Sequence, residues 1–484
     1  MQRLEAALKE ATAFLKRKGV RYADARFVET LGEDIQVKNQ TVEALARETD
    51  RGVGVRVLWR GAWGFASTAD LSDGAVHEAA GAALRTARAS ASANTEKSRL
   101  APQEPHEGEW RGPCERDPFQ VPLDEKLEEI FRATEILKKN PAVKTAEGSM
   151  SFARRTRLFV STDGACIRQV KTTSGAGVSA TAVRDGEFQR RSYPTSQGGN
   201  HASRGYEFVE AMRLPSHAER VAGEAAALLR APECPYGERD LIVGSSQLAL
   251  QVHESCGHPI ELDRVLGSEV SLAGGSFLTL DKWKKFRYGS PAVSITADAT
   301  LEGGLGSFGF DDEGVPARRT PVVKEGLFVN YLTSRETARA LGLRSNGSMR
   351  ADGWNVMPLI RMVNVSLEPG GADLDSLVAD TRDGVLVDTN KSWSIDDLRL
   401  NFQFGCEIGW RIERGRVTGI VKNPLYTGAT PEFWNACDAV CGPKEWELWG
   451  VANCGKGEPV QTAKVGHGTA PARFRRVEVG VKKQ

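Results

Sequence analysis

The chain has 484 residues and a balanced charge, with 64 lysine and arginine residues against 63 aspartate and glutamate residues. The sequence has no excess of basic residues that would attract nucleic acid or an anionic membrane, so no partner of either kind is expected. The sequence also lacks the roughly 20 consecutive apolar residues of a membrane span and the apolar core of a signal peptide. Eight cysteines are too sparse for a disulfide framework, which predicts a cytoplasmic protein with reduced thiols.

The length predicts at least two domains, because single hydrophobic cores stop growing near about 250 to 300 residues. Residues 1–230 show the order of helix, several antiparallel strands and helix twice. The patterns predict helices over residues 1–19, 75–91, 122–139 and 206–229, with strand turns at Asn39-Gln40, Arg60-Gly61, Thr162-Asp163-Gly164 and Arg184-Asp185-Gly186. Residues 92–118 are polar and predict a linker. We therefore predict an N-terminal α+β domain over residues 1–230, with an internal duplication.

Residues 231–484 predict a second, β-rich domain. A proline-containing boundary precedes an apolar strand at residues 240–243 and a helix that starts near Gln247, with Ser245-Ser246 as its cap. Many short strand patterns follow, and only residues 334–341 and 431–440 favour helices. This pattern is typical of a barrel or sandwich packed around the helix at 253–263. The glycine-rich residues 267–309 fit either a wall or lid of the site or a plain surface excursion.

The stretch VHESCGHPIELD, residues 252–263, holds two of the seven histidines. Neutral imidazole is the commonest zinc ligand, and a carboxylate such as Glu254 beside a metal-bound water is the usual proton acceptor. In an ideal helix His253 and His258 stand about 140° apart, so one metal could not bind both. Gly257 and Pro259 favour a one-residue bulge that would bring the two rings together. The alternative is a buried helix end with two unrelated histidines.

A catalytic zinc usually has three protein ligands and a water molecule, so a third ligand must be found. The candidates are Glu261, Asp263, Cys256, Cys406, Cys437, Cys441 and Cys454. The CxxxC pair formed by Cys437 and Cys441 fits a helix face with two small buried residues equally well. Cys454 follows a predicted strand in a small-residue turn, which would expose its thiolate near Lys456. Chemistry alone makes Cys454 only the first among several candidates.

Three ordered blocks together resemble the TldD/PmbA family of metallopeptidases, and the likeness covers essentially the whole chain. The blocks are His253-Glu254-x-x-x-His258-x-x-Glu261-x-Asp263, residues 309–316 (GFDDEGVP) with Arg319-Thr320, and residues 453–457 (NCGKG). The retained HExxxH motif is similar to the catalytic, TldD-like type, although Glu458-Pro459 departs from the glutamine expected after the third block. The resemblance implies Zn²⁺ bound by His253, His258 and Cys454, with Glu254 as general base. Glu261 and Asp263 would orient a histidine or close the cavity.

The function predicted in this way is a zinc-dependent peptidase acting on unfolded or extended peptides. The resemblance also implies a dimer, either a homodimer or a heterodimer with an inactive paralogue. Two alternatives are a metal-dependent amide hydrolase that is not proteolytic and a peptide-binding or assembly subunit with a structural metal. Candidates for stabilising an oxyanion are Arg350, Asn364 and Lys456, and nothing in the sequence selects among them.

Two further groups of polar residues are predicted to lie outside the metal site. Asp311, Asp312 and Glu313 could suggest a hard-cation site, but without a repeated oxygen-ligand loop they favour a solvated turn or a structural hydrogen-bond cluster. The other five histidines have no ligand-spaced partner and are predicted at the surface or in loops: His77, His106, His201, His217 and His467. His467 is the first of these to reconsider, because it follows Cys454 closely.

Overall fold

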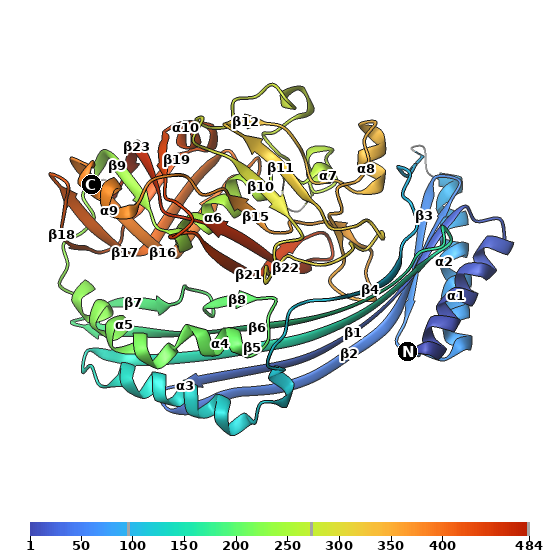
Figure 1. The fold of residues 1–484 in the computed structure, drawn as a ribbon, viewed down its shortest axis with the longest axis horizontal. Coiled ribbons are helices and arrows are strands. Elements are labelled where there is room, and N and C mark those ends of the chain that lie inside the picture. The colour runs from blue at the N-terminus through green and yellow to red at the C-terminus, as the bar shows by residue number, and fades with distance from the viewer. Residues whose placement is uncertain (94–96, 272–273, 482–484) are drawn as a thin grey trace.

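The computed structural model describes residues 1–93, 97–271 and 274–481. The fold is mixed α+β, and a long curved sheet from the N-terminal part extends beneath the C-terminal part (Figure 1). Helices cover the outer side of this sheet near both of its ends, and the C-terminal part lies along its inner, concave side. Within the described residues, no helix has both the length and the apolar character needed to cross a membrane.

The N-terminal part contains a sheet in the order β3-β2-β1-β5-β6-β4, with β7 and β8 also paired to β6. Its elements are α1 (Gln2–Arg17), β1 (Tyr22–Lys38), β2 (Thr41–Trp59), β3 (Ala62–Thr68), α2 (Asp73–Ala93), β4 (Glu107–Arg111), α3 (Leu123–Lys138), β5 (Val143–Ser161), β6 (Cys166–Arg184), β7 (Glu187–Tyr193), β8 (Asn200–Ala202), α4 (Glu207–Met212) and α5 (Leu214–Leu228). Helix, three antiparallel strands and helix occur twice, and the first strands of the two sets, β1 and β5, pair antiparallel at the centre. This order agrees with the predicted internal duplication.

The strands of this sheet are longer than the sequence patterns predict. Ala23, Ala25 and Phe27 of β1 pack in the core cluster of α1 and α2, whereas Ile35 and Val37 pack in that of α3 and α5. The middle of β1 belongs to neither cluster, so its sequence shows no apolar alternation there. Its backbone nevertheless pairs with β2 and β5 along the whole strand. Hydrophobic alternation therefore predicts two short strands where the chain forms one.

Two predictions in the N-terminal part were wrong in detail. The expected linker at residues 92–118 contains β4, which pairs parallel with β6, whereas its residues 94–96 lie outside the described residues. The single helix predicted at 206–229 is divided into α4 and α5 at Arg213, whose φ of +49° is incompatible with a continuous α-helix. Pro215 in the first turn of α5 also lacks the N–H that a continuous helix would need.

The C-terminal part is built around a barrel-like ring of strands, as the sequence predicted. The strands follow the order β16-β9-β23-β19-β17, and the ring closes because β17 also pairs with β16. Two further strands pair with members of the ring: β18 with β17 and β20 with β23. The elements, besides a 3₁₀ turn at Leu280–Lys282, are β9 (Gly237–Val243), α6 (Ser245–Val252), a π-helical turn (His253–Gly257), α7 (Leu262–Val265), β10 (Ile295–Asp298), β11 (Arg319–Lys324), β12 (Leu327–Phe328), α8 (Arg335–Ala340), β13 (Met349–Arg350), β14 (Leu359–Ile360), β15 (Val365–Leu367), α9 (Leu374–Ala379), β16 (Asp383–Ile395), β17 (Asn401–Glu413), β18 (Arg416–Val421), β19 (Leu425–Ala429), α10 (Thr430–Asn435), β20 (Cys437–Val440), β21 (Glu447–Lys456), β22 (Gln461–Thr469) and β23 (Ala472–Val479). The helix predicted at 431–440 ends at Asn435, and its second half forms β20 instead.

The helix α6 lies at the centre of this C-terminal part. It packs between β16 of the ring and the strands β15, β21 and β22, and nearly all of its residues are buried. Parts of the segment predicted at 267–309 are buried, so it is not a plain surface excursion: Phe277, Leu278 and Tyr288 belong to the same core cluster as Leu248 and Val252 of α6. Leu272 and Ala273 of that segment lie outside the described residues.

Candidate metal centre

The helix that carries the HExxxH motif changes its winding where the motif begins. α6 continues into the π-helical turn His253–Gly257, and the His258 N–H donates to the His253 carbonyl at 3.2 Å. A π turn inserts one residue into the helix, which brings positions five apart onto nearly the same face. The predicted bulge is therefore present, although the helix begins after Gly244 and Ser245-Ser246 do not cap it.

Gly257 is required at this turn because of what packs against it. A Cβ atom at this position would lie 2.1 Å from Sδ of Met362, which is itself fully buried. The backbone of Gly257 does not adopt a positive φ, so the constraint comes from the close approach of Met362 and not from a turn conformation. A side chain here would displace either Met362 or the turn that holds the two histidines.

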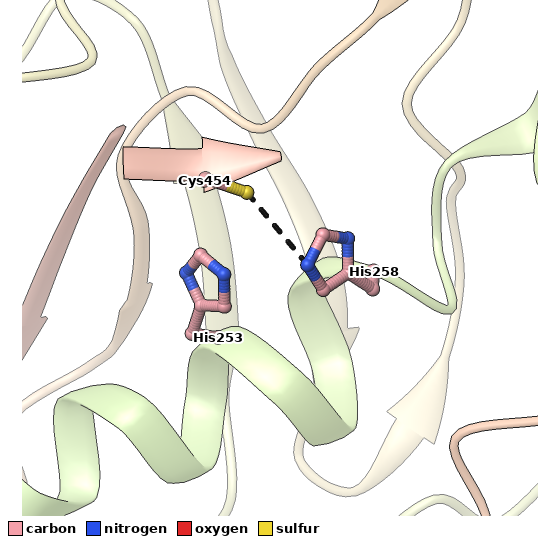
Figure 2. A group of neighbouring side chains, drawn as sticks. All are labelled: His253, His258 and Cys454. Atoms are coloured by element: carbon pink, nitrogen blue, oxygen red, sulfur yellow. Dashed lines mark hydrogen bonds between the residues drawn. The ribbon is translucent and has the colours of Figure 1, made fainter. Parts of the chain in front are cut away.

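Both histidines of the turn point toward Cys454 on β21 (Figure 2). His258 Nε2 and Cys454 Sγ lie 3.7 Å apart, and the candidate ligand atoms of His253, His258 and Cys454 all lie within 4.8 Å of one another. In a tetrahedral zinc site with Zn–N of about 2.0 Å and Zn–S of about 2.3 Å, neighbouring ligand atoms are about 3.3 to 3.6 Å apart. The group therefore has nearly the spacing that zinc requires, and all three residues are buried.

The surroundings of Cys454 differ from the sequence prediction of an exposed turn. Cys454 lies within β21, opposite Ala463 of β22, and only 4% of its surface is exposed. Burial opposes ionisation of the thiol, but nearby His258 and Arg361 outweigh burial, and the pKa of Cys454 lies below its ordinary value. Lys456 does not assist, because its ammonium group bonds to Asp263 and to the Ile360 carbonyl. The thiol is therefore activated by the site itself and not by solvent exposure.

His467 was predicted to lie at the surface or in a loop, and this prediction was wrong. It is fully buried in β22, and its Nε2 lies 2.8 Å from Nδ1 of His253. His467 Nδ1 must donate to the Val365 carbonyl, 2.8 Å away, because a carbonyl can only accept. Its Nε2 then accepts from Nδ1–H of His253, which leaves the lone pair of His253 Nε2 free for a metal. Burial, followed by the nearby His253, holds the pKa of His467 well below its ordinary value, so the ring is neutral as this chain of hydrogen bonds requires.

Replacing His467 with phenylalanine is expected to weaken zinc binding about 10- to 100-fold, the usual effect of removing a partner that orients a ligand. Phenylalanine is chosen because it fills the ring volume without accepting the His253 proton. The measurement is a competition titration against a chromophoric chelator. His77, which is exposed, is the matched control, and His77→Phe should leave the affinity unchanged. Equal affinities in the two variants would contradict the orienting role of His467.

Glu261 and Asp263 occupy different positions relative to the histidines. Glu261 Oε2 accepts from Nδ1 of His258 at 3.2 Å, which directs the Nε2 lone pair of His258 toward Cys454. Burial raises the pKa of Glu261, but Lys456 and His258 lower it further, so the net pKa is well below the ordinary value and the carboxylate is ionised. Asp263 contacts neither histidine and instead accepts from Lys456 at 2.7 Å. Glu261 thus orients a candidate ligand, and Asp263 holds the cation that balances Glu261.

Glu254 faces Arg399, which was not among the residues predicted from the sequence to belong to the site. Arg399 Nη1 donates to Glu254 Oε2 at 2.8 Å from a turn that follows β16, with φ of +64° at Arg399. Burial raises the pKa of Glu254, but His258, His253 and Arg399 together lower it below its ordinary value. The buried carboxylate is therefore ionised at neutral pH, which is the form a general base needs.

Comparison with protein families covers nearly the whole chain. Residues 237–480 match the PmbA/TldA metallopeptidase C-terminal domain, residues 116–231 match the central domain of the same metallopeptidases, and residues 23–91 match their domain 1. The chain belongs to the PmbA/TldD metallopeptidase family. The fold class and the resemblance predicted from the sequence are therefore confirmed.

Several relatives in this family carry the name metalloprotease. A metalloprotease of Methanocaldococcus jannaschii is 28% identical over 447 residues, which is 92% of this chain and 94% of the relative. A metalloprotease TldD homologue of Haemophilus influenzae is 24% identical over 474 residues, with 96% and 94% covered. A zinc metalloprotease TldD homologue of Saccharolobus solfataricus is 25% identical over 245 residues, covering 50% of this chain and 52% of that protein. These names support a peptidase that uses a metal.

Solved structures share the fold of this PmbA/TldD-family chain. A Thermotoga maritima protein named as a modulator of a DNA gyrase superposes with a TM-score of 0.77 at 20% identity, covering 98% of this chain and all (100%) of that one. TldE from Thermococcus kodakarensis also has a TM-score of 0.77, at 16% identity and with the same coverage of 98% and 100%. At such low identities the similarity concerns the fold alone.

The remaining candidates from the sequence lie away from the three metal-binding candidates of this family member. The four other candidate cysteines are buried, and burial raises the pKa of each thiol: Cys256, Cys406, Cys437 and Cys441. Among the oxyanion candidates, Arg350 donates to the Met362 and Lys464 carbonyls, and Asn364 bonds to Asp298 and Ser307. His106, His201 and His217 are partly buried and His77 is exposed, and none of them belongs to the metal-binding group.

The acidic block at residues 311–313 is a buried structural cluster, so the alternative of a solvated turn was wrong. Asp311 accepts from backbone N–H groups of its own turn and from that of Met349. Asp312 accepts from Arg157 of the N-terminal sheet, while Glu313 accepts from the Arg335 N–H. Two arginines of the N-terminal sheet, Arg157 beside Asp312 and Arg56 beside Glu313, therefore compensate two of these carboxylates, and the cluster joins the two parts of the chain.

Proposed function

We propose that this chain is a zinc-dependent peptidase that hydrolyses peptide bonds of unfolded or extended peptides. The observation that carries the proposal is the convergence of the His253 and His258 rings on the Cys454 thiol, beside the ionised Glu254. Two imidazoles and a thiolate favour zinc over magnesium or calcium, which prefer oxygen ligands. The name of the Saccharolobus solfataricus relative supports the same metal.

The residues of the chain fit a zinc ion in both geometry and protonation. His467 and Glu261 accept the Nδ1 protons of His253 and His258, so both Nε2 lone pairs are free to bind the metal. A bound zinc ion would polarise the scissile carbonyl and lower the pKa of water, the usual contribution of zinc to hydrolysis. His253, His258 and Cys454 would hold the ion, which leaves a tetrahedral position for water or substrate.

Glu254 is the residue proposed to move the proton. Arg399 holds its Oε2, and among the described residues no protein donor contacts its Oε1. This oxygen is free to take a proton from the attacking water and to pass it to the leaving amine. A site whose metal is only structural has no need of an ionised carboxylate at this position, which argues against the assembly-subunit alternative.

The substrate and the partners proposed here follow from the family and the fold. Exposed strand edges can pair with the backbone of an extended peptide, which would select for conformation more than for side chains. The dimer, formed with a second copy or with an inactive paralogue, and the cytoplasmic location remain part of this proposal. The fold shared with TldE is consistent with a partner of the same architecture.

Zinc content and peptide cleavage measured on one preparation test this function. We expect about one zinc per chain by atomic emission, and cleavage of an unstructured peptide mixture that a chelator abolishes and zinc restores. Zinc together with peptide binding but no cleavage, even with a paralogue added, would favour the binding-subunit alternative. Turnover of small amides without peptide cleavage would favour the amide hydrolase.

A further inference from the structure

A cavity of about 580 Å³ lies between the N-terminal sheet and the C-terminal part. Residues of β5 and β6 form one wall, and residues 350–356 and 459–464 form the other. The second wall includes Ala463, which lies directly opposite Cys454 in the β21–β22 hairpin. The cavity therefore adjoins the candidate metal centre, on the side where the two parts of the chain face each other (Figure 1).

Five cationic side chains line this cavity: Arg155, Arg157, Lys171, Arg350 and Lys464. Arg157 is paired with the Asp312 carboxylate. Across the described residues, none of the other four forms an ion pair with a carboxylate. Four cations thus share a confined space without a protein anion bound to any of them.

The four unpaired cations donate only to uncharged acceptors. Arg155, Lys171 and Arg350 donate to backbone carbonyls, which are those of Ala351, Asp352, Leu305, Ser307, Met362 and Lys464. Lys464 donates to the Thr173 hydroxyl at 3.1 Å, and its two remaining N–H groups have no protein acceptor among the described residues. Carbonyl oxygens accept hydrogen bonds from these side chains, but they carry no negative charge and so do not neutralise the cations.

The acidic residues near the cavity do not neutralise these cations. Asp312 is already engaged by Arg157 and lies 3.9 Å from Arg26. Glu48, Asp50 and Asp352 are at the exposed rim, where Asp50 accepts from the Trp354 indole and Asp352 accepts from the Thr462 N–H. Burial lowers the pKa of Lys464 by more than the exposed Asp34 and Asp352 raise it from a distance, and neither carboxylate forms an ion pair with Lys464.

The lowered pKa values of the four groups show that this arrangement is electrostatically unfavourable. Burial, followed by the neighbouring cations Arg350 and Lys464, lowers the pKa of Lys171 well below its ordinary value. Burial also lowers the pKa of Arg155 to about 10, that of Arg350 to about 9 and that of Lys464 to about 8. Cations gathered at such a cost are typical of a site that binds an anion, which would relieve their mutual repulsion.

We propose that this cavity binds a carboxylate of the peptide that the metal centre cuts, so that peptides with an acidic side chain or a free C-terminus are preferred substrates. The inference rests on the proposed peptidase function, since a peptide reaching the hairpin of Cys454 carries carboxylates either on aspartate and glutamate side chains or at its C-terminus. Guanidinium and ammonium groups are the usual donors to a carboxylate. Apolar lining residues such as Phe308, Val356 and Val460 give the rest of an extended peptide a surface to pack against.

Lys464 is the residue to change, because it is bonded only to one hydroxyl. Arg155 and Lys171 join the two parts of the chain through carbonyls, and Arg350 holds two segments of the C-terminal part together, so variants of these residues would risk unfolding. Lys464→Met removes the charge and keeps most of the side-chain length, and Lys464→Arg restores the charge. Lys324→Met removes one exposed positive charge elsewhere and is the matched control.

Binding is measured by fluorescence anisotropy in a Glu254→Gln background, which prevents cleavage. The probes are two labelled unstructured peptides of one sequence, one with glutamates and one with glutamines, each with a free or an amidated C-terminus. We expect the glutamate peptide or the free C-terminus to bind tighter, and Lys464→Met to reduce that preference about 10- to 100-fold. Lys464→Arg should restore it, and Lys324→Met should leave it intact. In the unchanged chain the preference should also fall as salt is added.

The outcomes separate this proposal from the peptidase proposal. Preference for acidic peptides that depends on Lys464 but occurs without cleavage by the unmutated chain would support the anion site and contradict the peptidase. Cleavage with equal binding of all four peptides, whether glutamate or glutamine and whether free or amidated, would overturn the anion site and leave the peptidase intact. An acidic preference that survives in Lys464→Met and does not respond to salt would also overturn it. The amidated peptides decide whether a side chain or the C-terminus supplies the carboxylate.

Discussion

Cys454→Ser is expected to weaken zinc binding by well over a hundredfold, so that the purified variant contains almost no metal. Even groups that only orient a ligand change metal affinity about 10- to 100-fold, and removing a ligand has a larger effect. A serine hydroxyl remains protonated at neutral pH, whereas the thiol of Cys454 has a pKa lowered by His258 and Arg361 despite its burial. The measurement is zinc per chain by atomic emission, together with a competition titration against a chelator.

Cys256→Ala is the matched control for this variant. Cys256 belongs to the same HExxxH segment and is equally buried, but it packs in the apolar core and not in the metal-binding group. It should keep its zinc, although it will lose some stability because a buried side chain is shortened. If Cys454→Ser keeps full zinc affinity, the third ligand is a carboxylate, and Glu261 would have to leave His258 to provide it.

The helix that carries the histidines could be predicted from the sequence because its signals are local. In a regular helix one metal could not bind both His253 and His258, and Gly257 and Pro259 favour a one-residue bulge, which is present as the observed π turn. The ring of strands and the duplicated N-terminal order also follow from local patterns and turns. The positions of these helices and strands depend on residues that are close together in the chain, whereas the closure of the ring pairs β9 with the distant strands β16 and β23.

The nearby Glu261 was predicted to orient a histidine, but the partners of His253 and Glu254 were not predicted, because they come from distant parts of the chain. His467 is 214 residues from His253 in sequence, and Arg399 is 145 residues from Glu254. Nothing near Arg399 marks it as part of the site. His467 was predicted at the surface or in a loop, and its only signal was its position shortly after Cys454. The same limit applies to Cys454. Its small neighbours are typical of a turn, so an exposed turn was predicted, whereas Cys454 lies in β21 and pairs with β22. Pairing across strands, and not local propensity, builds this part of the site.

Glu254→Gln is expected to lower kcat for peptide cleavage by about 10² to 10⁴, the usual range for removal of a general base, while zinc stays bound. Glutamine matches the shape of glutamate, and its carbonyl oxygen can still accept from Arg399 Nη1, so the local packing should persist. Its amide nitrogen cannot accept a proton, which removes the function without removing the contact. The measurement is steady-state cleavage of an unstructured peptide, with zinc per chain determined on the same sample.

Two comparisons make this result specific to proton transfer. Glu325→Gln, at an exposed position of the same part of the chain, should cleave at the unmutated rate. KM should change little in Glu254→Gln, because a group needed only in the transition state contributes to kcat and not to the binding of substrate. Retained turnover in Glu254→Gln would show that another group takes the proton, whereas loss of zinc would show that Glu254 supports the metal-binding residues instead. A fall in kcat with full zinc content and unchanged KM is the one outcome that assigns Glu254 as the base.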